Sequence, residues 1–400
     1  MKQKHNWILI TAFVMFIALL NGVHADFSVQ SGNVSVNGEI NVSITSINIS
    51  KSFVITSARS TSNGPDAILV TARLTNSTNL KLNNYAGGIA NVEYQIITEN
   101  MSIISSQSGN FSYGAGAGTS NYNITINQVN LSSSFIIIRT RLNIGTAGAM
   151  EQGMWKAKFN NATQMNIQRI GTNSNGGELI WQVVDWNNSR VINGSLTIPD
   201  TTADSILSST VNVSKSFMVF STALDTSTLV ASMVMGRYNS TTATFNRQTN
   251  TGSASVEYFI IEDNSIRTQT GFTYAATTTQ INQTITAVNT SRTFIASSSD
   301  STGGVSTWTN SFFSSRFFNS TLIYFQKDGA LQSQNISWYA VGLFRIQANF
   351  TSPTETSGAF ISRNNISVNA IANYGNLANI TLRIYNSTGT LINLTNSTTS

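Results

Sequence analysis

The sequence has no cysteine, and its two histidines, His5 and His24, both lie within the first 25 of its 400 residues. Without cysteine no disulfide can form. Beyond those first residues, the usual zinc, haem and iron–sulfur ligands are missing, as are the Ser-His-Asp and Cys-His nucleophile systems. We therefore expect no catalytic residue of these kinds, no metal site and no cofactor.

Charge is also scarce. Charged residues make up 10% of the chain, whereas an ordinary soluble domain has about 25%. The net charge of +5 comes from 22 Lys and Arg against 17 Asp and Glu, which is too weak an excess to indicate nucleic-acid binding. Hydrophobic residues make up 40%, so the chain can bury a core and is not a disordered polar tract.

Residues 1–25 have the pattern of a signal peptide. Lys2 and Lys4 precede a 14-residue apolar run, Trp7–Leu20, and small residues lead to Ala25, as a cleavage site requires. The alternative, an uncleaved anchor, needs about 20 apolar residues. No later segment is long and apolar enough to span a bilayer. We therefore expect the mature chain to be secreted or on the cell surface.

Four internal repeats organise the chain. An apolar–Asn–x–Ser–x–Ser/Thr–Phe motif ends at Phe53, Phe135, Phe217 and Phe294, with spacings of 82, 82 and 77 residues. Three further motifs recur with it. They are a basic residue before a second Asn-x-Thr (Arg73, Lys158, Arg237, Arg316), an aromatic-led apolar run (from Tyr94, Trp181, Tyr258, Trp338) and Gln-x-Gly (Gln30, Gln107, Gln269, with divergent copies at Asn193 and Gln347).

These motifs are short, rich in β-branched and aromatic residues, and bounded by Gly, Asn and Ser, which predicts strands and turns. We expect an all-β fold of tandem antiparallel β-sandwich repeats, Ig-like or jelly-roll-like, following one another as a rod or curved string. The predicted segments are 1–25 (signal peptide), 26–106, 107–192, 193–268 and 269–350 (repeats 1 to 4), and 351–400.

Asn-x-Ser/Thr sequons are enriched. There are 23 of them, about twice the roughly 12 that random order would give, and on an exported chain they are glycosylation acceptors. The alternative is that turn preferences of Asn and Ser produce them. The candidate glycosylation sites are Asn48, Asn76, Asn130, Asn161, Asn212, Asn239, Asn289 and Asn319, two in each repeat, with Asn379 and Asn386.

The last 50 residues have a different pattern. Asn364–Ala370 begins with an Asn-Asn-Ile-Ser-Val-Asn-Ala strand, and Asn379–Gly389 has the form of a strand followed by a turn. This segment resembles the Ig-like surface domains of bacteria and archaea. The resemblance implies an immunoglobulin-like sandwich in a modular exported protein and carries no catalytic residues. Because only about half of such a domain precedes Ser400, we expect residues 351–400 to be incomplete, with any membrane anchor beyond residue 400.

Other candidate chemistry is sparse. Glu93 and Glu257 recur at one strand position, where exposed strand residues are expected rather than a glycosidase pair. Asp200 and Asp204 could bridge calcium, but no Asp-rich loop is present. Trp186 does not recur among the repeats and follows a strand, so it is the candidate for an exposed ligand contact. The repeated basic residues could bind an acidic partner or protect strand edges.

The sequence therefore predicts a non-enzymatic, exported, N-glycosylated cell-surface protein with a structural or adhesive role. Its partners would be other surface proteins or glycans, or copies of itself. The alternatives are a lectin-like array of carbohydrate-binding modules, suggested by a Trp338–Gly342 segment similar to lectin-type sandwiches, and a carbohydrate-active enzyme.

Overall fold

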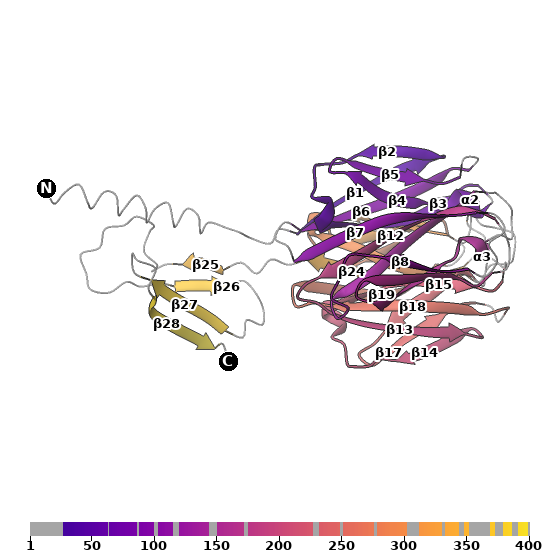
Figure 1. The fold of residues 1–400 in the computed structure, drawn as a ribbon. Helices are drawn as coiled ribbons and strands as arrows, with labels where there is room; N and C mark the ends of the chain where they lie inside the picture. Colours follow the sequence, from indigo (N-terminus) through magenta and orange to yellow (C-terminus); the bar gives the residue numbers. More distant parts are fainter. Residues whose placement is uncertain are drawn as a thin grey trace. The chain divides into compact units, whose positions relative to one another are not determined.

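The computed structural model describes residues 27–343 and four strands between residues 348 and 398. The gaps in the first range are 63, 86–87, 100–102, 115–119, 144–149, 172–174, 227–231, 249–250, 276–277, 302–311 and 330–332. The chain divides into one compact body, Asp26–Phe344, and a second unit that contains Arg345–Ser400. We call the first the four-repeat body (Figure 1).

The four-repeat body contains four copies of a six-stranded unit. Repeat 1 contains β1 (Phe27–Val36), β2 (Glu39–Ser43), β3 (Ser52–Ser60), β4 (Thr71–Asn76), β5 (Asn79–Asn83) and β6 (Ala90–Glu99). Repeat 2 contains β7 (Ile104–Tyr113), β8 (Ser120–Thr125), β9 (Ser134–Leu142), β10 (Lys156–Asn161), β11 (Gln164–Arg169) and β12 (Gly177–Trp186). Repeat 3 contains β13 (Arg190–Ile198), β14 (Thr202–Ile206), β15 (Ser216–Leu224), β16 (Met235–Tyr238), β17 (Thr242–Asn246) and β18 (Ala254–Glu262). Repeat 4 contains β19 (Ile266–Ala275), β20 (Gln280–Thr284), β21 (Thr293–Ser301), β22 (Ser314–Asn319), β23 (Leu322–Gln326) and β24 (Gln334–Leu343).

Short helical segments connect some of these strands. The single-turn helices α2 (Pro65–Ile68) and α3 (Met150–Gly153) follow the third strands of repeats 1 and 2. The 3₁₀ turns η1 (Ile49–Lys51), η2 (Val213–Lys215) and η3 (Thr290–Arg292) precede the third strands of repeats 1, 3 and 4.

Every repeat has the same topology. In repeat 1 the sheets have the orders β1-β6-β3 and β2-β5-β4, all antiparallel, and the other repeats have the corresponding orders. The first strand thus pairs with the sixth and the second with the fifth, which is the pairing of a jelly roll. The predicted all-β class and the tandem antiparallel sandwiches are confirmed.

The register explains two of the sequence motifs. Gly32 of the Gln-x-Gly motif lies directly opposite Tyr94, which begins the aromatic-led run. A Cβ atom on Gly32 would lie 2.4 Å from the Tyr94 hydroxyl, so the ring occupies the space above the glycine. The same pairing recurs as Gly109–Trp181, Gly194–Tyr258 and Gly271–Trp338. The glycine is therefore required by the cross-strand ring.

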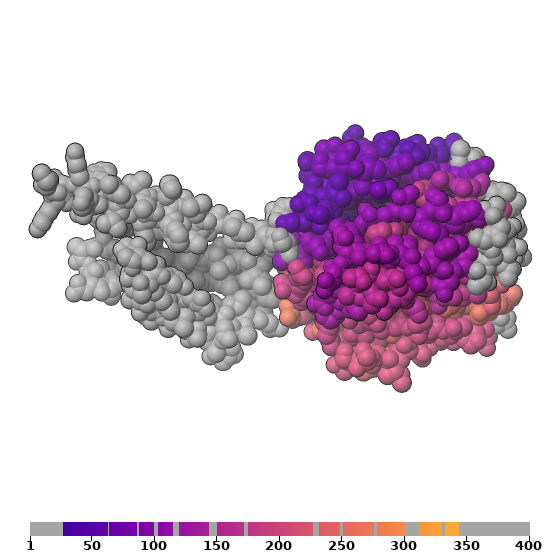
Figure 2. Space-filling view, in the orientation of Figure 1, coloured from indigo at the N-terminus to yellow at the C-terminus, as the bar shows by residue number. Residues whose placement is uncertain are grey.

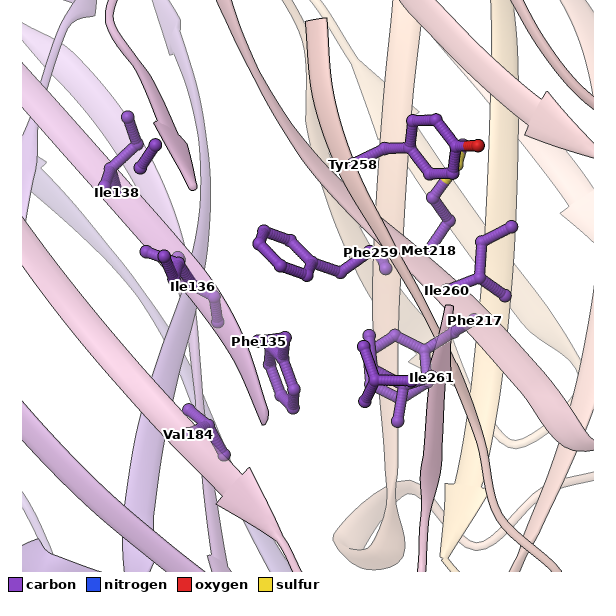
Figure 3. Close-up of a cluster of buried hydrophobic side chains, with 14 of the residues drawn as sticks. Phe135, Ile136, Ile138, Val184, Phe217, Met218, Tyr258, Phe259, Ile260 and Ile261 are labelled. Atoms are coloured by element: carbon purple, nitrogen blue, oxygen red, sulfur yellow. The ribbon is translucent and has the colours of Figure 1, made fainter. Parts of the chain in front are cut away.

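The repeats close into a ring. Phe53, Phe135, Phe217 and Phe294, the second residues of the four third strands, meet edge to face. Successive ring centroids are 5.8, 6.1 and 5.2 Å apart, and Phe294 returns to Phe53 at 6.2 Å. Figure 3 shows Phe135 and Phe217 in this core, with Ile261 beside Phe217. The expected rod or string is therefore wrong, because repeats 1 and 4 pack against each other.

Each junction of the ring has the same geometry. The fourth strand of one repeat packs on the sixth strand of the next: β4 on β12, β10 on β18, β16 on β24, and β22 on β6. In the face shown in Figure 2, repeats 1, 2 and 3 lie one beside the next, from indigo to rose. A sandwich of six strands is small, and this shared packing supplies the remaining core.

The expected repeat boundaries, Gln107, Asn193 and Gln269, lie three residues inside β7, β13 and β19. Ala348 and Asn349 of the fifth Gln-x-Gly copy lie in β25 (Ala348–Thr351), which pairs with β26 (Asn369–Ala372), and Gln347 lies outside the described residues. A second pair is formed by β27 (Asn379–Tyr385) and β28 (Leu391–Thr398). The predicted signal peptide lies outside the described residues.

Candidate functional site

The four-repeat body has two distinct ends. At one end the first and third strands of each repeat begin and the sixth strand ends, as the pairs Phe27–Glu99 and Ser52–Thr98 show. The motif sequons lie here, so we call it the sequon end. At the other end the third strands finish and lead into α2 and α3; we call it the cavity end, and these helices mark it in Figure 1.

The first sequon of each repeat forms a turn before the third strand. The Asn48 Oδ1 atom accepts hydrogen bonds from the Ser50 backbone N–H at 3.1 Å and from the Ser50 hydroxyl at 2.8 Å. Asn130, Asn212 and Asn289 make the same pair of bonds with Ser132, Ser214 and Ser291. This is an Asx turn, so the motif has a structural use whether or not the asparagine is modified.

The second sequon of each repeat caps the hairpin between the fourth and fifth strands. Asn76 Oδ1 accepts from the Thr78 N–H and hydroxyl at 2.9 and 3.1 Å, and Asn161, Asn239 and Asn319 do the same with Thr163, Thr241 and Thr321. Ile47 N–H donates to the Ser77 carbonyl at 2.9 Å, which places the two turns of a repeat side by side.

All eight aligned asparagines are exposed. Their Oδ1 atoms are engaged, while their Nδ2 atoms, to which a glycan would attach, make no hydrogen bond within the described residues. Of the two C-terminal candidates, Asn379 begins β27 and Asn386 lies outside the described residues.

The cavity end has no comparable motif. Ten asparagines occur in or beside the sequence segments that connect strands there, and none begins an Asn-x-Ser/Thr triplet. They are Asn37, Asn63, Asn83, Asn84, Asn143, Asn173, Asn175, Asn246, Asn250 and Asn310. The nearest sequon on a strand, Asn335 in β24, is half-buried and its side chain bonds to Asp300. Composition alone does not explain this contrast between the ends.

A cavity lies on the axis of the ring. Two residues after each phenylalanine the third strands still carry apolar side chains, such as Ile55 and Ile137, and four residues after it they carry the polar residues Ser57, Arg139, Ser221 and Ser298. The space between the strands is not filled there. A cavity of about 120 Å³ is lined by all four third strands, β3, β9, β15 and β21. A second cavity of about 310 Å³ follows toward the cavity end and shares Thr56, Ser57, Arg139 and Ser297 with the first.

Arg139 is the charged residue that lines both cavities. Its Nε donates to the Thr56 hydroxyl at 3.0 Å and its Nη2 to the Thr56 carbonyl at 3.2 Å, across the junction of repeats 1 and 2. Its Nη1 donates to the Ile138 carbonyl at 3.1 Å. Burial lowers the pKa of Arg139 to about 10, because enclosure disfavours the charged form.

One further recurring position is structural. Six residues after the hairpin Thr stand Asn84, Arg169, Arg247 and Lys327, all buried. Arg247 donates to the backbone carbonyls of Asp200, Thr251, Pro199 and Gly252, and Asn84 to those of Ala67 and Gly88. The recurrence of these residues can be read from the sequence. Their burial and their hydrogen bonds to loop carbonyls can be seen only in the structure.

Trp186 is not an exposed contact. It is completely buried and packs against Phe27, Phe53 and Phe217 at centroid distances of 5.7, 6.4 and 6.0 Å. The expectation of exposure was therefore wrong. Four repeats share the space near the axis, so a single large side chain from one repeat can fill it. A tryptophan that is present in only one repeat can therefore still be buried. Trp155 is also buried, and Trp308 lies outside the described residues.

The repeated acids pair with basic residues of a neighbouring repeat. Glu93 and Glu257 are 4% and 5% exposed, so they are not the exposed strand residues that were expected. Glu257 pairs with Lys156 of repeat 2 at 3.4 Å, and Glu93 with Arg316 of repeat 4 at 3.7 Å. The neighbouring repeat covers the sheet face that carries these glutamates, which the alternation of residues along a strand would by itself predict to be exposed to solvent.

The other repeated basic residues contribute less to these junctions. Arg73 reaches Asn110 of repeat 2 at 3.4 Å, whereas Lys158 and Arg237 are exposed. In the part of the chain that the structure describes, no group of three metal-ligating side chains occurs. Within the same residues, no helix has the length and apolarity needed to cross a membrane.

These features define a class: a closed ring of four jelly-roll-like repeats with sequons at one end and an axial cavity toward the other. No protein-family model and no curated protein matches the chain.

Proposed function

We propose that this chain is an exported, N-glycosylated cell-surface protein without enzymatic activity, and that its role is structural or adhesive. The proposal rests on the eight aligned, exposed sequons at one end of the ring. Glycans there would supply the hydration that a chain with 10% charged residues otherwise lacks. The cavity end, where the connecting segments hold no sequon, would stay accessible to a partner.

The proposed partners are other surface proteins, surface glycans or further copies of the chain. Residues 351–400 would form the Ig-like module that their sequence resembles. Because the repeats form a ring, adhesion would use one end of the body, not a surface extended along a rod.

The experiment must separate glycosylation from turn formation. The full chain is produced in a host that N-glycosylates exported proteins, and its intact mass is measured before and after glycan removal. Asn48→Asp keeps the oxygen that accepts from Ser50 and removes the amide nitrogen that a glycan needs, whereas Asn48→Ala removes both.

We expect Asn48→Asp to lose one glycan mass with little loss of stability, and Asn48→Ala to lose the mass and the turn, at a cost of about 1 kcal/mol. A mass equal to the bare polypeptide in the unsubstituted protein would reject glycosylation and leave the turn as the reason for the motif.

The second candidate is carbohydrate binding, which the axial cavity, with apolar residues and Ser and Thr hydroxyls in its lining, favours over a flat surface. A glycan-binding screen of the deglycosylated protein tests it, and absence of any ligand would reject it. The screen requires the intact four-repeat body, since the phenylalanine ring is shared by all repeats. An enzymatic function has less support, because Glu93 and Glu257 are buried against cationic partners at repeat junctions.

A further inference from the structure

The axial cavity has a mixed lining. Part of its wall is apolar, with Ile55, Ile137 and Val219 among the lining residues, and small polar residues form another part. Thr56 and Ser57 come from β3, Ser297 and Ser298 from β21, and Ser221 and Thr222 from β15. An apolar strand residue at these positions would have filled the axis, as the phenylalanines do. The sequence instead leaves two adjoining spaces of about 120 and 310 Å³, the second within the size range of small-molecule sites.

Among the described residues, the Arg139 charge in this cavity has no counter-charge. All its hydrogen bonds go to neutral acceptors, on Thr56 and Ile138. Within the described residues, no carboxylate forms an ion pair with it. Arg139 is half-buried, and a charge largely removed from water without a partner is costly, so proteins normally pair such groups.

Three acids of the cavity end have other partners. Asp300 accepts from Gln248 at 2.9 Å, Asp328 pairs with Arg59, and Asp225 accepts from Ser253. The sequence segments 144–149, 227–231 and 302–311, which follow the third strands of repeats 2, 3 and 4, contain no Asp or Glu. These three segments therefore contain no carboxylate that could pair with Arg139.

Thr56 provides a second donor. Its hydroxyl accepts from Arg139 Nε, and the hydroxyl hydrogen has no acceptor within the described residues. A hydroxyl that accepts from a guanidinium is polarised, which strengthens its own donation. Arg139 and Thr56 therefore place a positive charge and a donor together on the wall shared by both cavities.

We propose that the axial cavity binds a small anionic group, a carboxylate, sulfate or phosphate, on a ligand no larger than a monosaccharide, with Arg139 supplying the charge and Thr56 a hydrogen bond. Guanidinium groups suit such oxyanions, because their planar donors match the acceptor oxygens. The proposal does not depend on glycosylation, and the site lies on the axis, away from the turns that hold the eight sequons.

The test is calorimetric titration and thermal shift of the full chain, in Tris chloride, with glucuronate, phosphate and sulfate, and with glucose as the neutral comparison. We expect at least one anion to bind with a Kd at or below about 1 mM and to raise Tm, and glucose not to bind. Binding of glucuronate alone would identify an acidic sugar, and equal binding of phosphate a bare oxyanion; both outcomes support the proposal.

Three variants locate the site. Arg139→Gln should weaken binding at least tenfold, and Thr56→Val severalfold. Arg141→Gln is the matched control: Arg141 lies two residues along the same strand and pairs with Glu178 at 3.0 Å, so binding should be unchanged. If Arg139→Gln does not fold, the comparison of ligand affinity in Thr56→Val and Arg141→Gln still tests the proposal.

Three results would overturn the proposal. They are the absence of binding by any anion at 10 mM, equal binding of glucose and glucuronate, and equal affinity in Thr56→Val or Arg139→Gln and the unsubstituted chain.

Discussion

Gln95 of repeat 1 and Ile295 of repeat 4, 200 residues apart in the chain, exchange two hydrogen bonds that close the ring. Gln95 Nε2 donates to the Ile295 carbonyl at 3.1 Å, and the Ile295 N–H donates to Gln95 Oε1 at 2.7 Å. Ile295 lies in β21, an edge strand. The amide of Gln95 thus satisfies an edge that would otherwise have unpaired backbone groups.

At the position of Gln95, the four junctions have one of two kinds of contact: a glutamine hydrogen-bonded to an edge strand, or an aromatic pair. Gln182 of repeat 2 exchanges the equivalent bonds with Val54 of repeat 1 at 2.9 and 3.2 Å. At the other two junctions the residue is aromatic: Phe259 packs on Phe159 at 5.9 Å, and Tyr339 stacks on Tyr238 at 5.3 Å. The junction of repeats 4 and 1, which closes the ring, therefore has the same glutamine contact as the junction of repeats 1 and 2.

Replacing Gln95 by Leu should destabilise the protein by about 1–3 kcal/mol, because the N–H and C=O of Ile295 would stay buried without partners. Chemical denaturation of the full chain measures this. Gln182→Leu should cost a similar amount. Gln30→Leu is the control, since Gln30 makes the same bonds with Thr45 in an exposed loop of its own repeat. If Gln95→Leu costs no more than Gln30→Leu, the ring is not closed in solution.

Phe217→Ala should cost about 3–5 kcal/mol. Phe217 is fully buried and contacts Phe135, Phe294 and Trp186. Because four repeats share this core, the body should also unfold in one calorimetric transition. Phe272→Ala is the matched control, since Phe272 is 52% exposed. Separate transitions for single repeats would contradict a shared core.

Much of the fold could be predicted from the sequence, because the motifs that recur are strands and turns with local causes. The closure of the ring could not. The recurrence of Phe53 and its equivalents shows that the repeats are alike, but the angle between successive repeats depends on contacts such as β4 on β12. Those contacts join residues that no local pattern relates.

The site was harder to predict than the fold. The sequons were found, since they are local triplets. Arg139 was missed because its role depends on an empty axis that exists only once the ring is closed. The sequence holds a signal that could have been used: the second halves of β3 and β21, such as Ser297–Ser299, are rich in Ser and Thr, whereas core strands are usually apolar.

Gly109→Ala should be destabilising by about 1–3 kcal/mol through overpacking. A Cβ atom at Gly109 would lie 2.4 Å from Trp181 Cζ2. In a Trp181→Ala background the clash is absent, so a double-mutant cycle by denaturation should give a coupling energy of similar size. Gly114→Ala is the control, because its Cβ would meet nothing within 4 Å. Additive effects of Gly109→Ala and Trp181→Ala would contradict the proposed cross-strand pairing.

Glu93 should make stability depend on acid pH. Burial raises the pKa of Glu93, against the opposing effects of Arg316, Asn33 and Arg59. The folded protein then keeps the Glu93 proton at pH values where the unfolded chain, with a carboxyl pKa near 4.5, has lost it. Stability from this group is therefore greatest below pH 4.5 and falls as pH rises through the raised pKa.

Glu93→Gln removes this titration. The free energy of unfolding of the unsubstituted chain, relative to Glu93→Gln, should rise as pH is lowered from 7 to about 4.5 and stay constant below. Denaturation curves across this range measure the difference, with Glu39→Gln as the control, since Glu39 is half-exposed and pairs with Lys81 at 2.6 Å. A relative loss of stability on acidification would mean that the ion pair with Arg316 outweighs burial at the closing junction.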